Sequence, residues 1–331
     1  MNTIAATLES LSLGQATRFL NLTVFPLVGA TGYERDYRSL HDAVRAGTAC
    51  VREVSEGGSV PELTLENAGK QPVLVLEGEE LVGAKQNRTA NATILAPAGK
   101  IVRIPVTCVE SGRWEYRTRE FEPSEQIHFA RGRVNKMASV STSMQQAGTR
   151  SADQADVWHD IAEKSSRMHV AAPTSAMTDV FEAHRSRLDD YVGAFRAAPQ
   201  QTGAVFALGE RIEGLELFDC PQTLAEMLPR LIRSYAIDAI ESVGSSERSP
   251  TPESAEDLIR RLQRAEFERY PAIGEGTEVR LSTPRVIGAG LLAQGRVVHL
   301  VAFAVPTTAG RGEPDAGGFT RMERRRREMR R

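Results

Sequence analysis

The residues best suited to chemistry lie in the first third of the chain, and the first group ends an apolar run. Over residues 101–109 apolar side chains share one face of an expected strand, and the next position on that face is Glu110. A carboxylate that continues an apolar row costs free energy unless a cation or donors meet it, and Arg113 follows three residues later. Glu110 is therefore a candidate general base. The alternative is a strand-end ion pair of Glu110 with Arg113, with Trp114 as a core plug.

A second polar group fills residues 77–88, with the sequence EGEELVGAKQNR. Gly78 and Gly83 allow tight turns there. Its amides offer donors and acceptors, and its arginine fork suits carboxylate or phosphate. This mixture of side chains predicts a binding site for a sugar or nucleotide. Glu79 is a second candidate general base. The alternative is that the segment is a solvated hairpin loop. The candidate ligand-binding residues of both groups are Lys85, Gln86, Asn87, Arg88, Arg113 and Trp114.

Other reactive side chains give weaker signals. Cys108 lies among valines on an expected strand face, where a cysteine usually acts as a small buried hydrophobe rather than a nucleophile. His299 and His184 have apolar neighbours and are expected to be packing residues. The histidines show no HExxH or HxH spacing, so we assign no metal. A GxG in residues 288–295 falls in a strand pattern and opens no helix, so we expect no dinucleotide cofactor.

Strands are expected at both ends of the chain and helices between them. Alternation and turn residues predict strands at 22–28, 49–54, 62–66, 73–77, 89–95, 101–109, 204–208, 212–218, 278–281, 286–293 and 297–303. Pro97-Ala98-Gly99 predicts a hairpin between two of them. Residues 117–150 read as an irregular loop. Helices are expected from a capping box at Ser151 and Gln154, from about 175 to 195, from 223 to 241, and after the N-cap Thr251.

This order of elements predicts an α+β fold with a mainly antiparallel sheet in the N-terminal part, helices in the middle and closing strands near the C-terminus. A regular β-α-β-α alternation is absent, so a doubly wound parallel sheet is not expected. We expect one domain over residues 1–305; a division near residue 150 is the alternative. Residues 306–331 are rich in Gly, Arg and Glu and are expected to be a disordered tail.

Composition sets broad limits on function. The chain has 331 residues, 41 Lys plus Arg and 43 Asp plus Glu, 41% hydrophobic and 25% charged residues, as in globular proteins. No apolar run reaches the ~18–20 residues of a membrane-spanning helix, and no secretory signal is visible, so a cytoplasmic protein is expected. The three cysteines predict no disulfide framework. Acids interrupt the arginine run at 324–327, so nucleic acid is not an expected partner, and the oligomeric state is not predicted.

The run EGEELVGAKQNR, followed by an expected strand pair and CVESGRW, resembles the ARG and rhodanese-phosphatase-superfamily-associated protein family. The segments GAVFALGERIEGLELFD, LPRLIRSYAIDA and GRVVHLVAF are similar to it too, so the resemblance covers roughly residues 18–305. The family takes its name from association with ADP-ribosylglycohydrolase and rhodanese-phosphatase domains, which implies work on ADP-ribose or another nucleotide-derived compound. The resemblance implies no catalytic residues. The matching motif residues are Glu79, Lys85, Gln86, Asn87, Arg88, Cys108, Glu110, Arg113 and Trp114, and with less weight Glu216 and Tyr235.

Three hypotheses follow. In the first, an enzyme acts on such a compound through a pocket formed by residues 77–88 and 108–114; Glu110 or Glu79 is the general base, and Lys85 and Arg88 hold phosphate. In the second, a non-catalytic module binds the same ligand class. In the third, the polar residues only hold a hairpin against the helical layer. A cupin-like sugar-binding module is a further alternative, although its usual histidine ligands are missing.

Overall fold

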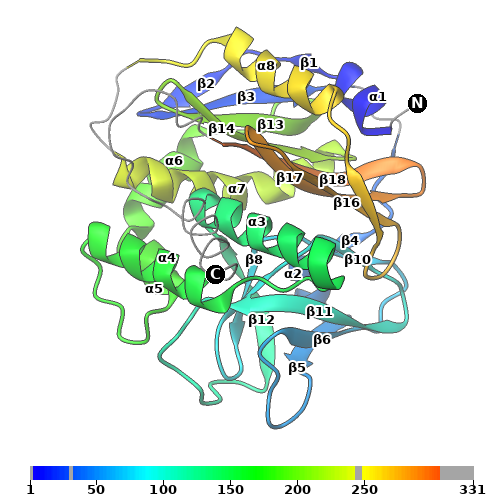
Figure 1. Cartoon of the computed structure of the whole chain (residues 1–331), viewed down its shortest axis with the longest axis vertical. Helices are drawn as coiled ribbons and strands as arrows, with labels where there is room; N and C mark the ends of the chain where they lie inside the picture. Colours follow the sequence, from blue (N-terminus) through cyan, green and yellow to red (C-terminus); the bar gives the residue numbers. More distant parts are fainter. Residues whose placement is uncertain (1–2, 30–32, 243–247, 306–331) are drawn as a thin grey trace, which may run out of the picture.

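The computed structural model describes residues 3–29, 33–242 and 248–305, and its strands form one large sheet, a closed barrel and a small sheet (Figure 1). The expected tail, residues 306–331, lies outside the described residues. The large sheet is antiparallel and unites strands from both ends of the described chain. Its order is β1 (Ser12–Leu13), β3 (Leu22–Val28), β13 (Gln201–Leu208), β14 (Arg211–Phe218), β18 (Arg296–Ala304), β17 (Val286–Ala293), β16 (Thr277–Ser282) and β15 (Glu268–Pro271), with β2 (Thr17–Phe19) paired to β3.

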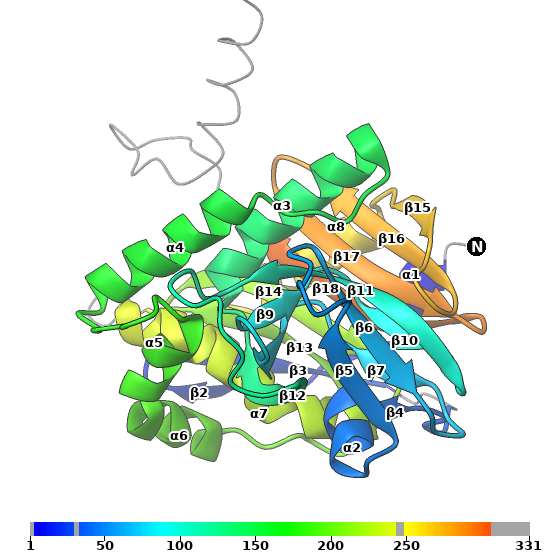
Figure 2. The same cartoon turned by 90° about the horizontal axis from the view of Figure 1, so that it is seen from below.

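The barrel closes through six strands because β9 returns to β11. Its order is β11 (Lys100–Cys108), β6 (Glu62–Asn67), β5 (Ala49–Glu53), β12 (Glu120–Ile127), β8 (Glu79–Gly83) and β9 (Arg88–Ala90). In the closing pair Cys108 faces Arg88 and Val106 faces Ala90. A small sheet of β10 (Ile94–Ala96), β7 (Val73–Val75) and β4 (Arg38–Ser39), with α2 (Leu40–Arg45), lies beside the barrel (Figure 2).

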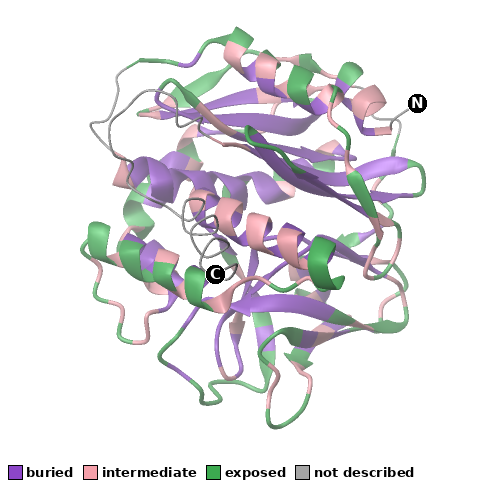
Figure 3. Cartoon of the chain, in the orientation of Figure 1, coloured by how far each residue is buried: buried purple, intermediate pink, exposed green. Residues whose placement is uncertain are grey.

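Helices cover both faces of the large sheet. On one face α1 (Thr3–Glu9) and α8 (Pro252–Gln263) bury apolar residues against it. Between the sheet and the barrel lie α3 (Ala130–Ala147) and α7 (Pro221–Glu241), and α7 is largely buried (Figure 3). Beside them lie α4 (Gln154–Arg167), α5 (Met177–Ala183) and α6 (Arg185–Ala194). The predicted α+β class and antiparallel sheet are confirmed, and β13 is buried throughout because helices cover the sheet on both sides.

Several local expectations were wrong. Residues 117–150 are not an irregular loop, because they form β12 and α3. Residues 77–88 are not a hairpin loop, since they contain the barrel strand β8. Residues 89–95 do not form one strand, because the chain leaves β9 and pairs β10 with β7 instead of with β11.

Two helix boundaries also differ from the expectation. Asp153, rather than Ser151, caps α4, and its side chain accepts from the backbone amides of Ala155 and Asp156. The helix expected from 175 to 195 is broken into α5 and α6 at His184. The helix after Thr251 begins as predicted, because the Thr251 side chain accepts from the Ser254 amide and Pro252 stands in the first turn.

Candidate functional site

The two polar stretches meet through Arg113, which lies in the turn after β11. Its Nε donates to Glu110 Oε1 at 2.9 Å and its Nη2 to Glu110 Oε2 at 2.7 Å, a two-point ion pair. The same guanidinium donates to the carbonyl oxygens of Gly83 and Ala84 and to Asn87 Oδ1. Arg113 therefore ties the 83–87 segment to the 110–113 turn, and it brings together the candidate residues Glu110, Asn87 and Arg113.

Glu110 is fully buried at this junction. The backbone amide of Asn87 donates to its Oε2 at 3.0 Å. Burial opposes ionisation, but the hydrogen bonds from Arg113, Thr174 and the Asn87 amide outweigh it and lower the pKa of Glu110. Glu110 is thus an ionised carboxylate with donors on both oxygens, an arrangement that suits holding a turn in place.

A chain of hydrogen bonds continues from Asn87 to a second buried carboxyl, Glu80. Asn87 Nδ2 donates to Thr178 Oγ1 at 3.1 Å, and this hydroxyl donates to Glu80 Oε1 at 2.8 Å. The Ser124 hydroxyl donates to Glu80 Oε2 at 2.8 Å. Burial raises the pKa of Glu80 to about 7, although both hydroxyl donors act in the opposite direction. Glu80 can therefore take up or release a proton near neutral pH.

Glu79 lies apart from Glu110. Its Oε1 is 2.8 Å from Arg230 Nη1 on α7, and the Leu76 amide donates to its Oε2. Neighbouring residues of a strand point to opposite faces, so Glu79 and Glu80 have different partners. Glu79 was predicted as a general base and Glu80 was not; because the segment was expected to lie between strands, strand parity could not distinguish the two side chains.

Arg88 and Glu53 form a sparsely bonded pair at one end of the barrel. Both side chains are buried, and Arg88 Nη2 is 3.7 Å from Glu53 Oε1, beyond hydrogen-bond distance. Arg88 Nη1 donates to Gln86 Oε1 at 2.9 Å, but Nε and Nη2 have no hydrogen-bond partner among the described residues, and neither do the two oxygens of Glu53. Burial raises the pKa of the neighbouring Cys108 thiol, while Arg88 acts in the opposite direction, so Cys108 is a neutral thiol.

Above this pair, Lys85, Trp114 and Tyr116 gather at the surface. Lys85 Nζ lies 5.3 Å from the Trp114 ring centre and 5.0 Å from that of Tyr116, and it donates to the Gly57 carbonyl. The Arg88 guanidinium lies 5.6 Å from the Trp114 ring centre. Trp114 is not a core plug, since it is 47% exposed, and Tyr116 is 48% exposed. Lys85, Arg88 and Trp114 thus share one end of the barrel.

A ring of buried polar groups joins the barrel, α3 and the large sheet. Arg133 donates to Glu77 Oε2 at 3.0 Å and to Glu216 Oε1 at 2.6 Å. His299 bonds Glu216 Oε2 and the Thr93 hydroxyl, and that hydroxyl accepts from the Glu77 amide, which closes the ring. Burial opposes ionisation of Glu77, but Lys136 and Arg133 lower its pKa to about 2.

Glu216 was named from the family resemblance, with less weight than the other motif residues, and Glu77, Arg133 and Lys136 were not predicted to lie with it in a buried ion-pair network. The available signal was two cations three residues apart in a segment that was expected to be a loop. Tyr235 stacks on Phe206, with ring centres 4.1 Å apart, and its hydroxyl has no hydrogen-bond partner among the described residues.

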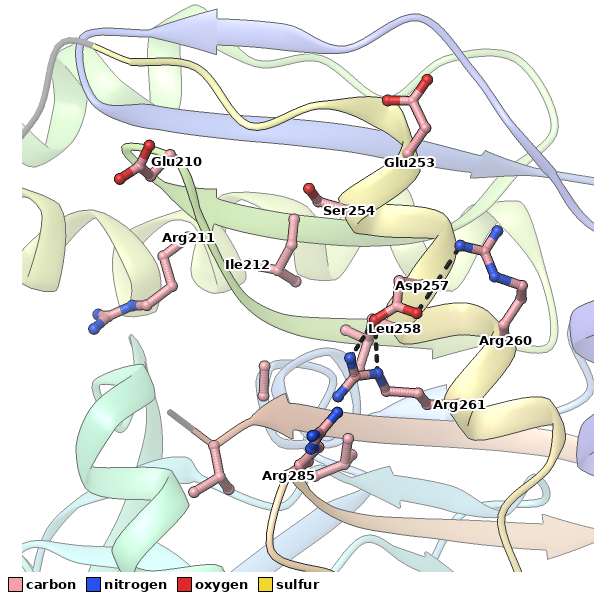
Figure 4. Close-up of a pocket in the computed structure, with 13 residues that line it drawn as sticks. Glu210, Arg211, Ile212, Glu253, Ser254, Asp257, Leu258, Arg260, Arg261 and Arg285 are labelled. Carbon is pink, nitrogen blue, oxygen red and sulfur yellow. Dashed lines mark hydrogen bonds and ion pairs between the residues drawn. The ribbon is translucent and has the colours of Figure 1, made fainter. Parts of the chain in front are cut away.

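Two surface hollows lie away from these groups. The larger, of about 600 Å³, lies between α8 and the ends of β14, β17 and β18, and it is lined by apolar side chains and by charged residues such as Arg211, Asp257 and Arg285 (Figure 4). The smaller, of about 240 Å³, lies beside α4. Neither is lined by a candidate residue from the sequence.

Within residues 3–29, 33–242 and 248–305, no three His, Cys, Asp or Glu side chains gather in a way that could hold a metal ion. In the same part of the chain, no helix is long and apolar enough to cross a membrane.

Comparison with curated proteins and with solved structures finds no similar protein. The family model of the ARG and rhodanese-phosphatase-superfamily-associated protein domain matches residues 10–303. The match spans the barrel, the large sheet and the described helices after α1, and the chain belongs to this family.

Proposed function

We propose that the chain binds a nucleotide-derived small molecule, such as ADP-ribose, at the barrel end around Lys85 and Trp114. One observation carries the proposal: the Lys85 ammonium lies about equally far from two aromatic rings that are each half exposed. Exposed aromatic rings beside a cation suit a ligand that has both an aromatic base and a phosphate. In this proposal Trp114 or Tyr116 stacks on the base and Lys85 holds phosphate.

The energetics support this choice of ligand. Stacking of a base on an aromatic side chain contributes about 1–3 kcal/mol, and every base offers a face for it. A lysine ammonium is a mobile point charge that binds phosphate without fixed geometry. Arg88 and Gln86 lie below Trp114 and add donors and an acceptor, while the Glu110–Arg113 pair holds the two segments in position.

Catalysis on the bound compound is a second candidate, favoured by the raised pKa of Glu80. The general-base roles of Glu110 and Glu79 remain predictions, and both carboxylates already hold strong donors. Glu80 connects to Asn87 through Thr178, so its proton is linked to the segment that carries Lys85. In this second candidate Glu80 is the group that exchanges a proton.

Titration calorimetry with ADP-ribose, ADP and NAD tests the binding proposal. Lys85→Ala and Trp114→Ala are each expected to weaken binding by about tenfold or more, equivalent to about 1.4 kcal/mol. Lys100→Ala and Ile101→Ala are matched controls, because both residues are exposed on β11 away from the Lys85 cluster, and they should leave affinity unchanged. Failure of all three compounds to bind the wild-type chain would remove the proposal.

Chromatography of the same mixtures separates binding from catalysis. Product formation that is lost in Glu80→Gln, with affinity retained, would support the second candidate. Product formation that is lost in a folded Glu110→Gln variant, but kept in Glu80→Gln, would instead restore Glu110 as the base. Binding without any product would leave the non-catalytic module.

A further inference from the structure

We propose that Arg88 and Glu53 form a recognition pair for a neutral, hydroxyl-bearing group, in particular the vicinal diol of a sugar, beneath Trp114. This inference rests on the proposed function and names the part of the ligand that enters the barrel end. Glu53 was not a candidate in the sequence, and it becomes one because of its position opposite Arg88.

The first argument is the number of unmet hydrogen bonds. Arg88 is fully buried and the Glu53 side chain is 3% exposed, yet two guanidinium nitrogens and both carboxylate oxygens lack a hydrogen-bond partner among the described residues. Buried charged groups without partners are costly, so each such group in a native fold requires an explanation. The direct contact between the two side chains does not satisfy these groups, because the 3.7 Å between Arg88 Nη2 and Glu53 Oε1 is too long for a hydrogen bond. A polar ligand group with its own donors and acceptors would supply the missing hydrogen bonds of both side chains.

The second argument is charge. One guanidinium and one carboxylate sum to zero, so a phosphate placed between them would be repelled by Glu53 and a cation by Arg88. A vicinal diol fits both, because its O–H groups donate to the carboxylate and its oxygens accept from the guanidinium. In this proposal Lys85 binds the phosphate at the surface, where its ammonium forms no ion pair with a carboxylate of the described residues.

The third argument is the cover over the pair. Trp114 lies over the Arg88 guanidinium and is half exposed, and the proposal requires it to change rotamer so that the ligand can reach the pair. Gly58 packs beside the same residues with a φ of +78°; a Cβ there would lie 3.3 Å from Trp114 and Lys85 and 3.5 Å from Glu53. A side chain at this position would press on the residues that must move, and glycine leaves them room.

The test compares ADP with 2′-deoxy-ADP, which lacks the diol, by titration calorimetry on the full chain. The wild-type chain is expected to bind ADP about tenfold or more tighter, as hydrogen bonds to charged groups imply. In Glu53→Gln the preference should shrink to within about threefold, while 2′-deoxy-ADP still binds. Glu62→Gln, an exposed acid on β6, is the matched control and should keep the full preference.

The outcomes separate the two proposals. Equal binding of ADP and 2′-deoxy-ADP by the wild-type chain overturns the inference and leaves the proposed function standing, with water alone completing the pair. A preference that Glu53→Gln does not reduce also overturns it. Absence of binding by any nucleotide overturns the proposed function and this inference together. If Glu53→Gln does not fold, Arg88→Lys replaces it, and it is expected to lose the preference because a lysine cannot offer two parallel donors.

Discussion

Glu80 is a buried carboxyl that has two hydroxyl donors and forms no ion pair within the described residues, whereas Glu77, Glu79 and Glu110 each face a cation. Its pKa is about 7 in the folded protein, above the ordinary 4.5 of an unfolded glutamate. The folded state therefore binds more protons than the unfolded state between these two values. The contribution of Glu80 to the free energy of unfolding must therefore fall as pH rises through that window.

Glu80→Gln removes this contribution, since an amide does not titrate. Between pH 5 and pH 8 the wild-type chain is expected to lose up to about 3 kcal/mol relative to the variant, because each pKa unit corresponds to about 1.4 kcal/mol. Urea denaturation of both proteins at several pH values measures the difference, with Glu62→Gln as the control. Parallel pH profiles of Glu80→Gln and wild type would show that Glu80 does not titrate in this range.

Some residues of the candidate site were named from the sequence and others were not. Glu110 and Arg113 were found because strand alternation before them was clear and their partner is local. Glu80 was missed, since its role depends on which face of β8 it occupies and on Thr178, 98 residues away. No sequence pattern pointed to Glu53, because it lies near its partner Arg88 only once the barrel has closed.

At the scale of elements, long apolar alternation was reliable and mixed polar segments were not. β3, β14, β17 and β18 were predicted nearly to the residue. α3 was missed because its buried face includes Arg133, Lys136 and Ser141, so that face does not look apolar in sequence. β8 was missed for a similar reason, since its first two residues are buried glutamates. Buried polar faces hide elements from pattern analysis.

The pairing of β8 with β12 requires a glycine at position 83. Its φ is +134°, and a Cβ there would lie 2.6 Å from both the Glu120 carbonyl and the Thr118 hydroxyl oxygen. Gly83→Ala is expected to lower the free energy of unfolding by roughly 3 kcal/mol or more, from backbone strain and a steric clash together. Gly99→Ala is the control, because φ is +67° there with nothing within 4 Å, and strain alone costs about 1–2 kcal/mol. Urea denaturation compares them, and equal losses would show that the clash is relieved.

At the scale of the whole molecule, the ring of Glu77, Arg133, Glu216, His299 and Thr93 connects the barrel side to the large sheet through α3. Its members are far apart in sequence: 56 residues separate Glu77 from Arg133, and 206 separate Thr93 from His299. No local pattern encodes such contacts, so the junction could not be predicted. The ring supports the proposal that residues 1–305 form one domain, because its members come from the barrel side, α3 and the large sheet and are buried together.

Arg133→Ala tests this junction. The substitution leaves the carboxylates of Glu77 and Glu216 buried without their guanidinium partner, and removal of one partner from a buried ion pair costs about 3–5 kcal/mol. Arg103→Ala removes an exposed arginine from β11 and should change stability by less than about 0.5 kcal/mol. Urea denaturation of the wild-type chain should show one cooperative transition, and hydrogen exchange in Arg133→Ala should rise on both sides of the junction, in β8 and in β18. Two separate wild-type transitions, or faster exchange in the barrel alone, would mean that the barrel and the sheet fold independently and that the ring does not couple them.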